Sequence, residues 1–117
     1  MVRWCFAAMN SIEMPLLALM VLVWTADGSC GNHRQFLASW VNMRLGNLEH
    51  WLASREFIAT DEFSVADILM THVLSAGIKD EGLFTPYPGV AAYRDRCLAR
   101  PAWKRTIEAY CARVEAG

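Results

Sequence analysis

The side chains best suited to nucleophilic, metal or acid–base chemistry are few in this sequence. The four cysteines are Cys5, Cys30, Cys97 and Cys111. The three histidines are His33, His50 and His72. No two cysteines form a CxxC pair, and no histidine stands at zinc-ligand spacing from a cysteine. The sequence therefore predicts no metal site and no catalytic residue within this chain.

Asp67 and His72 are the two candidate acid–base groups, because both lie in an otherwise apolar segment. No nucleophile can be placed beside His72, so we expect a hydrogen-bonded core histidine rather than a base. A buried carboxylate is costly unless it accepts hydrogen bonds. Ser64 precedes Asp67 by three residues, as in a capping box, where each side chain bonds the backbone N–H of the other. We therefore interpret Ser64 and Asp67 as the structural N-terminal cap of a helix.

The elements that position these residues are predicted to be helices, because apolar residues recur at helical spacing and no long alternation indicates a strand. We expect an all-α bundle of about five helices, in one domain that covers residues 1–117. The first helix spans about residues 3–24 and is expected to kink at Pro15. The second helix presents one apolar stripe, made of Leu37, Val41, Leu45, Leu48 and Leu52.

Caps and prolines predict the other helices. The third begins at Ser64 and is the expected centre of the core, with Gly77 as its C-terminal cap. Pro88 and Pro101 are expected to begin the last two helices, because proline is favoured in a first turn. The last helix is predicted to turn one face inward, made of Trp103, Ile107, Tyr110, Cys111 and Val114.

Composition excludes several classes of protein. With 55% hydrophobic and 20% charged residues, the chain is expected to fold. Its 11 basic and 12 acidic residues give no basic surface for nucleic acid. The apolar run 14–24 has little charge before it and no clean cleavage site after it, which favours a buried or interface helix over a signal or membrane segment. Cysteines within apolar helical patterns suit a reducing, cytoplasmic location.

Four segments carry motifs that occur together in one protein family. Residues 62–70 contain the signature F-S/T-x-A-D-I, and residues 48–53 contain L-E-x-x-L. Residues 87–103 contain P-x-x-x-x-Y followed by R-P-A, and residues 4–17 look like the first helix of many bacterial members. In this order the segments resemble the C-terminal domain of the glutathione S-transferase family, over nearly the whole chain.

The resemblance implies a division of labour between two domains. Family members bind glutathione and activate its thiol in an N-terminal thioredoxin-like domain, whose alternating strands and helices do not occur in this sequence. This chain alone is therefore expected to bind no cofactor, and glutathione is the co-substrate only of the full-length family. The first helix of the C-terminal domain faces the active-site cleft in the family. Trp4, Ala8 and Ser11 share one face of that helix and are implied to bind the hydrophobic substrate, with packing against the missing domain as the alternative.

Two functions follow from the resemblance. The first is a C-terminal domain for hydrophobic-substrate binding and dimerisation, which supports conjugation of glutathione to apolar electrophiles only with a thioredoxin-like domain in cis or in trans. A homodimer through the first two helices is then expected. The second is a non-catalytic helical protein-interaction module. Neither function involves nucleic acid or a membrane.

Overall fold

The chain folds into helices close to those that the apolar spacing predicts. The computed structural model describes residues 2–24, 31–75 and 81–117. The first elements are α1 (Val2–Phe6), the π-helix η1 (Ala7–Glu13), α2 (Met14–Trp24) and α3 (Gly31–Leu52). They are followed by α4 (Val65–Ser75), the 3-10 helix η2 (Glu81–Phe84), α5 (Pro88–Leu98) and α6 (Pro101–Ala116). Because α1, η1 and α2 form one continuous segment, the expected all-α fold of about five helices is confirmed over the described residues.

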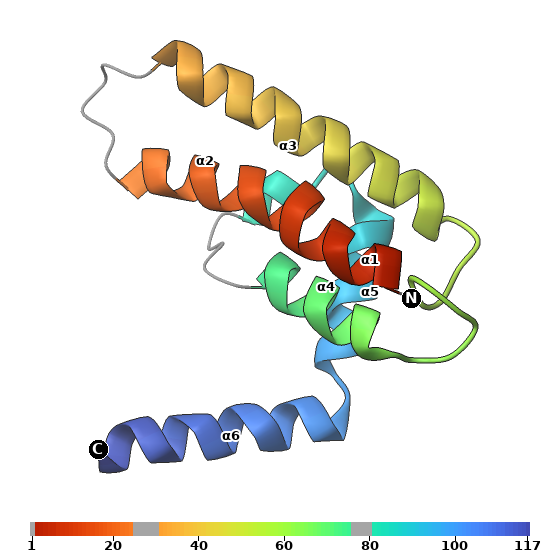
Figure 1. The fold of residues 1–117 in the computed structure, drawn as a ribbon, viewed down its shortest axis with the longest axis vertical. Helices are drawn as coiled ribbons and strands as arrows, with labels where there is room; N and C mark the ends of the chain where they lie inside the picture. The colour runs from red at the N-terminus through yellow and green to blue at the C-terminus, as the bar shows by residue number, and fades with distance from the viewer. Residues whose placement is uncertain (1, 25–30, 76–80) are drawn as a thin grey trace.

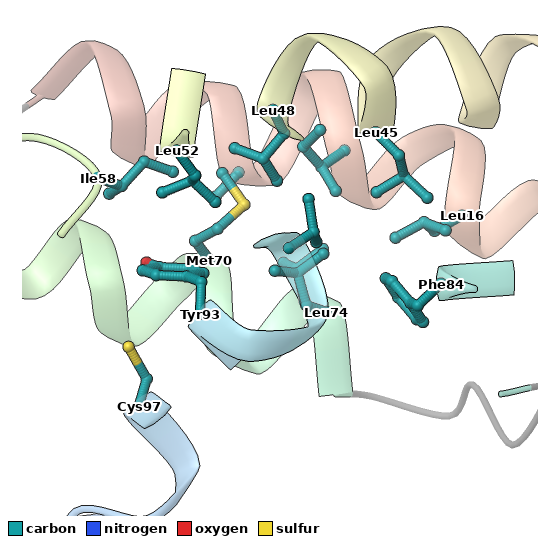
Figure 2. Close-up of a cluster of buried hydrophobic side chains, with 14 of the residues drawn as sticks. Leu16, Leu45, Leu48, Leu52, Ile58, Met70, Leu74, Phe84, Tyr93 and Cys97 are labelled. Carbon is teal, nitrogen blue, oxygen red and sulfur yellow. The ribbon is translucent and has the colours of Figure 1, made fainter. Parts of the chain in front are cut away.

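The N-terminal segment of α1, η1 and α2 lies between α3 and α4 (Figure 1), and η1 contacts both of these helices. α2 and α3 lie side by side and run in opposite directions, while α4 packs against α1 and η1, and α5 packs against both α3 and α4. The predicted stripe of α3 is buried at Val41, Leu45, Leu48 and Leu52. Figure 2 shows Leu48 of α3, Met70 of α4 and Tyr93 of α5 meeting in this core. Each fully buried aliphatic side chain contributes about 1.5–3 kcal/mol, so the stripe anchors the bundle.

The N-terminal helix continues through Pro15, and its distortion lies in the preceding turns. A proline inside a helix lacks an N–H and crowds the carbonyl four residues back, which here belongs to Ser11. The π-helix η1 spans Ala7–Glu13 and ends two residues before Pro15. Its i→i+5 hydrogen-bond pattern widens the helix where the proline needs room. The effect of Pro15 is therefore found upstream of the proline itself.

Gly77, the expected C-terminal cap of α4, lies outside the described residues. Within residues 2–24, 31–75 and 81–117, none of the helices combines the length and the hydrophobicity that crossing a membrane requires.

The start of α4 is organised by the carboxylate of Asp67, which is 0% exposed. Oδ2 accepts hydrogen bonds from the Ser64 N–H at 2.9 Å and from the Ser64 hydroxyl at 3.3 Å. Oδ1 accepts from the Ile58 N–H at 2.9 Å and from the Tyr93 hydroxyl at 2.8 Å. One carboxylate therefore joins the α3–α4 loop, the first turn of α4 and the middle of α5.

The Ser64 half of the expected capping box takes a different form. The Asp67 N–H donates to the Ser64 carbonyl oxygen at 3.0 Å, instead of the Ser64 hydroxyl oxygen. The hydroxyl donates to the Asp67 carboxylate, because an ionised acceptor makes the stronger hydrogen bond. The flanking apolar residues also differ from a hydrophobic staple, since Ile68 is 44% exposed and Phe63 packs edge-on against Phe57, with 5.8 Å between ring centres.

The raised pKa of Tyr93 favours this arrangement, because it keeps the hydroxyl protonated. Burial, together with the hydrogen bond to Asp67, raises the pKa of Tyr93 far above its usual value. The hydroxyl consequently keeps the proton that it donates to Asp67. Burial likewise raises the pKa of the neighbouring Cys97 thiol, so Cys97 stays protonated and behaves as a small apolar residue.

The start of α5 is capped by a side chain from another helix. Glu49 of α3 accepts the Gly89 N–H at 2.9 Å through Oε1 and the Val90 N–H at 2.7 Å through Oε2. Pro88, the first residue of α5, has no N–H to satisfy. A Cβ at Gly89 would lie 2.9 Å from Glu49 Oε1, so a side chain there would require the capping carboxylate to shift. The carboxylate also faces the positive end of the α5 dipole.

The last helix departs from the prediction. α6 projects away from the bundle (Figure 1), and α5 is the one described element that it contacts. The expected inner face is exposed, with 47% exposure at Ile107 and 61% at both Tyr110 and Val114. Arg100 precedes Pro101 and is extended, with φ −62° and ψ 133°, because a residue before proline disfavours the helical region. This extended residue turns α6 outward.

Replacing Asp67 with alanine should lower the free energy of unfolding by about 2–6 kcal/mol, because two buried donors, the Ile58 N–H and the Tyr93 hydroxyl, lose their acceptor. Asp67→Asn should cost less, since one carbonyl oxygen remains. Urea unfolding followed by circular dichroism measures both changes. The exposed Asp61→Ala is the matched control, and an Asp67→Ala protein as stable as this control would contradict the assignment.

Replacing Gly89 with alanine should destabilise the protein by about 0.5–2 kcal/mol, because the new Cβ displaces the Glu49 carboxylate that caps α5. In a Glu49→Ala background the same change should be neutral or stabilising by up to about 1 kcal/mol, because alanine is the better helix former. Thermal unfolding of the four proteins in this double-mutant cycle measures the sign reversal. Gly46→Ala on α3 serves as the control, since its Cβ would meet only Tyr87 Cε1 at 3.9 Å. Additive effects of the Glu49 and Gly89 changes would refute the cap.

Candidate functional site

A pocket of about 190 Å³ lies between the N-terminal helix and α3. Its lining residues come from these two segments alone and are Trp4, Ala7, Ser11, Ile12, Arg44, Asn47 and Leu48. Ile12 and Leu48 belong to the buried core, so the floor is apolar. Trp4 forms an aromatic wall, while Ser11, Arg44 and Asn47 carry polar groups. This combination of apolar walls with a few convergent polar groups is typical of small-molecule sites.

The structure brings together two of the three residues expected to bind substrate. Trp4 and Ser11 line the pocket, whereas Ala8 is 0% exposed and belongs to the core. Ala7 takes the place expected for Ala8. Ala7 and Ala8 lie three and four residues after Trp4, so helical spacing allows either of them to share its face. In the structure Ala8 packs into the core and Ala7 lies at the pocket.

Trp4 is held in place by stacked aromatic and cationic groups. Its ring centre lies 5.0 Å from that of Trp51, and the Arg3 guanidinium carbon lies 5.4 Å from the Trp4 ring centre. On Trp51 the Arg55 guanidinium carbon lies 3.8 Å from the ring centre. Cation–π contacts of this kind are each worth about 0.5–1 kcal/mol at exposed sites. Together they fix the aromatic wall of the pocket.

The position of Trp51 is tied to the Asp67 cap. The Trp51 Nε1–H donates to the Ile58 carbonyl oxygen at 2.8 Å, and the Ile58 N–H donates to Asp67 Oδ1. A short chain of contacts therefore connects the pocket wall with the start of α4. The cap is structural, but it contributes to the rigidity of the pocket.

Arg44 is the lining residue that sequence reasoning missed. Its Nε is buried and has no hydrogen-bond partner in the described part of the chain. The available signal was its position beside Leu45 and one turn before Leu48, at the edge of a buried stripe. A basic residue at the edge of an apolar stripe is usually solvated, so this signal alone did not indicate a pocket.

The lining residues that the structure describes offer groups that can bind a ligand, but they do not include a nucleophile paired with a general base. The hydroxyl of Ser11 has no base beside it among the described lining residues. His72, expected to be a hydrogen-bonded core residue, is instead exposed on α4, because the buried side of that helix is filled by Met70, Thr71 and Val73. Among residues 2–24, 31–75 and 81–117, no three His, Cys, Asp or Glu side chains gather closely enough to hold a metal ion.

The placement of Ala7 at the pocket and of Ala8 in the core can be tested by substituting each of these two alanines. Ala7→Leu should leave stability within about 0.5 kcal/mol, because the added atoms enter the pocket. Ala8→Leu should destabilise by about 1–3 kcal/mol, because it overpacks the core. Thermal unfolding of the two variants measures the difference, and each is the control for the other. The reverse order would contradict the placement of Ala7 at the pocket and Ala8 in the core.

Comparison with known protein families matches residues 39–101 to the glutathione S-transferase C-terminal domain. The matched segment covers more than half of the chain and runs from within α3 to the first residue of α6. It includes Glu49, the Asp67 cap and Gly89, together with Arg44, Asn47 and Leu48 of the pocket. A search of curated proteins found no significant match.

Proposed function

The chain belongs to the glutathione S-transferase C-terminal domain family, and from this premise we propose that it supplies the hydrophobic-substrate pocket of a glutathione S-transferase-like protein. The observation that carries the proposal is the pocket against the N-terminal helix, which is the helix that the family resemblance directs toward the active-site cleft. Trp4 and Ser11 bind the substrate, and Ala8 supports them from the core side.

The chemistry requires a second domain. The pocket offers an aromatic wall and polar groups, while the glutathione thiolate comes from a thioredoxin-like domain present in cis or in trans. With an aryl halide, the thiolate sulfur attacks the ring carbon that bears the halogen. A C–S bond forms, the C–halogen bond breaks, and the halide leaves with the bonding electrons. The thiol proton is removed beforehand within the thioredoxin-like domain.

Exposed apolar side chains support the need for partners. Large apolar residues are exposed on α1 and on the adjacent α4, including Phe6, Val65 and Ile68. Exposed apolar side chains that gather on neighbouring helices are typical of an interaction site. We assign this side to the thioredoxin-like domain.

The first two helices expose apolar side chains that are suited to a homodimer contact. Large apolar side chains are exposed on α2, at Met14 and Leu17, and on α3, at Phe36 and Met43. We propose that they form the homodimer contact.

The described cysteines Cys5, Cys97 and Cys111 are free, which suits a cytoplasmic protein.

A non-catalytic protein-interaction module is the alternative function. The exposed stripe on α6 favours it, because Ile107, Tyr110 and Val114 lie at helical spacing and turn toward solvent. In that case the chain would assemble with another protein through α6 without any conjugation chemistry.

A fusion protein tests the enzymatic proposal. A thioredoxin-like domain of the same family, joined ahead of this chain, should conjugate glutathione to 1-chloro-2,4-dinitrobenzene, followed by the absorbance of the product. Trp4→Ala should raise KM for the aryl halide several-fold and leave KM for glutathione unchanged, because it removes binding energy from one substrate only.

The control for this measurement is Trp40→Ala. Trp40 is half-buried on α3 and packs against Phe36, with ring centres 6.4 Å apart, and does not line the pocket. It should therefore leave both KM values unchanged. A folded fusion protein that is inert toward several electrophiles would overturn the enzymatic proposal and favour the interaction module.

A further inference from the structure

The pocket contains a buried hydrogen-bond donor that the protein does not satisfy. Arg44 Nε has no partner, although buried polar groups in folded proteins are nearly always paired. Arg44 is also one of the residues that line the pocket, so an acceptor bound beside its guanidinium would give this side chain the partner that it lacks. An unpaired donor in a residue of the pocket wall indicates that a bound ligand would supply a hydrogen-bond acceptor.

Two acidic side chains of the bundle, Glu49 and Asp67, are already engaged in hydrogen bonds. Glu49, five residues further along the same helix, uses both oxygens to cap α5. Asp67 accepts four hydrogen bonds from Ser64, Ile58 and Tyr93. Over the described ranges, the one ion pair between side chains is Arg94–Asp95, which does not involve Arg44. The charge of Arg44 is therefore not neutralised by the described part of its own chain.

The shape of a guanidinium group selects the acceptor. Nε–H and one terminal N–H point in parallel and match the two oxygens of a carboxylate. Ser11 and Asn47 add further hydrogen-bonding groups, while Trp4, Ile12 and Leu48 supply apolar walls. A cavity of about 150 Å³ accommodates a benzene ring. The pocket, at about 190 Å³, has room for one aromatic ring with a small substituent.

We propose that this pocket binds aromatic carboxylates, with Arg44 pairing with the carboxylate and Trp4 packing against the ring. The inference rests on the proposed function, because it names the substrate class of the same pocket. Substrates of this class are carboxylate-bearing electrophiles such as halogenated nitrobenzoates, in preference to their uncharged counterparts.

Isothermal titration calorimetry on the 117-residue chain tests the proposal with two matched probes. 4-Chloro-3-nitrobenzoate carries the carboxylate, and 4-chloro-3-nitrobenzamide has the same ring without the charge. The benzoate should bind about tenfold or more tightly than the amide, as a charge-assisted hydrogen bond predicts. Arg44→Gln should remove this preference while changing the affinity for the amide less than about twofold.

Two further variants make the result specific. Arg44→Lys keeps the charge but loses the planar fork, so its preference for the benzoate should lie between those of the wild type and Arg44→Gln. Arg105→Gln removes an equal charge from the exposed surface of α6 and should retain the full preference. If Arg44→Gln fails to fold by circular dichroism, the comparison of Arg44→Lys with the wild type decides the outcome.

Several results would overturn the proposal. These are equal affinities of the wild-type chain for the two probes, binding of neither probe, or an equal loss of preference in Arg105→Gln. The titration requires neither glutathione nor a second domain. A fusion protein that conjugates an uncharged aryl halide, combined with a chain that does not prefer the benzoate, rejects this inference alone. An inert fusion protein, combined with a clear preference for the benzoate, rejects only the conjugation reaction.

Discussion

The buried carboxylate of Asp67 is the interaction on which the rest of this structure depends. It accepts four hydrogen bonds from three separate parts of the chain. Each of these hydrogen bonds offsets part of the free-energy cost of burying the carboxylate. Because Ile58 also accepts a hydrogen bond from Trp51, and Trp51 stacks on Trp4, the influence of Asp67 extends to the wall of the pocket. A residue with no chemical role thereby helps to shape the surface that would contact a ligand.

A second constraint joins α3 to α5. The family motifs around Glu49 and Gly89 are forty residues apart in the sequence, yet they form one contact in which a carboxylate approaches the backbone of a glycine. Both this contact and the Asp67 cap place a carboxylate at the start of a helix, where the free N–H groups and the helix dipole favour negative charge. The segments that identify the family are thus structural, and the pocket draws its walls from other residues as well.

The pocket and α6 show how the same helical periodicity leads to different outcomes. In α3 the apolar stripe is buried because α2, η1 and α5 pack against this helix. In α6 a comparable stripe stays exposed, because the extended Arg100 directs the helix away from the bundle and the Arg100 guanidinium packs 3.7 Å from the Phe63 ring centre. An apolar stripe therefore indicates a helix that prefers a partner, but it does not say where the partner is.

The sequence by itself determined the features that depend on neighbouring residues. Apolar spacing gave the helices, Pro88 and Pro101 marked where the last two begin, and the Ser64–Asp67 spacing located the cap of α4. Only the tertiary structure decided that Ile58 and Tyr93 complete the Asp67 cap, that Glu49 caps α5, and that Arg44 reaches the pocket. It also decided that Ala7 and not Ala8 lines this pocket, since helical spacing from Trp4 allows either residue and packing places Ala8 in the core. The physical reason is range: caps and periodicity act within about one helical turn, whereas a pocket depends on the register and packing of segments that are distant in the chain.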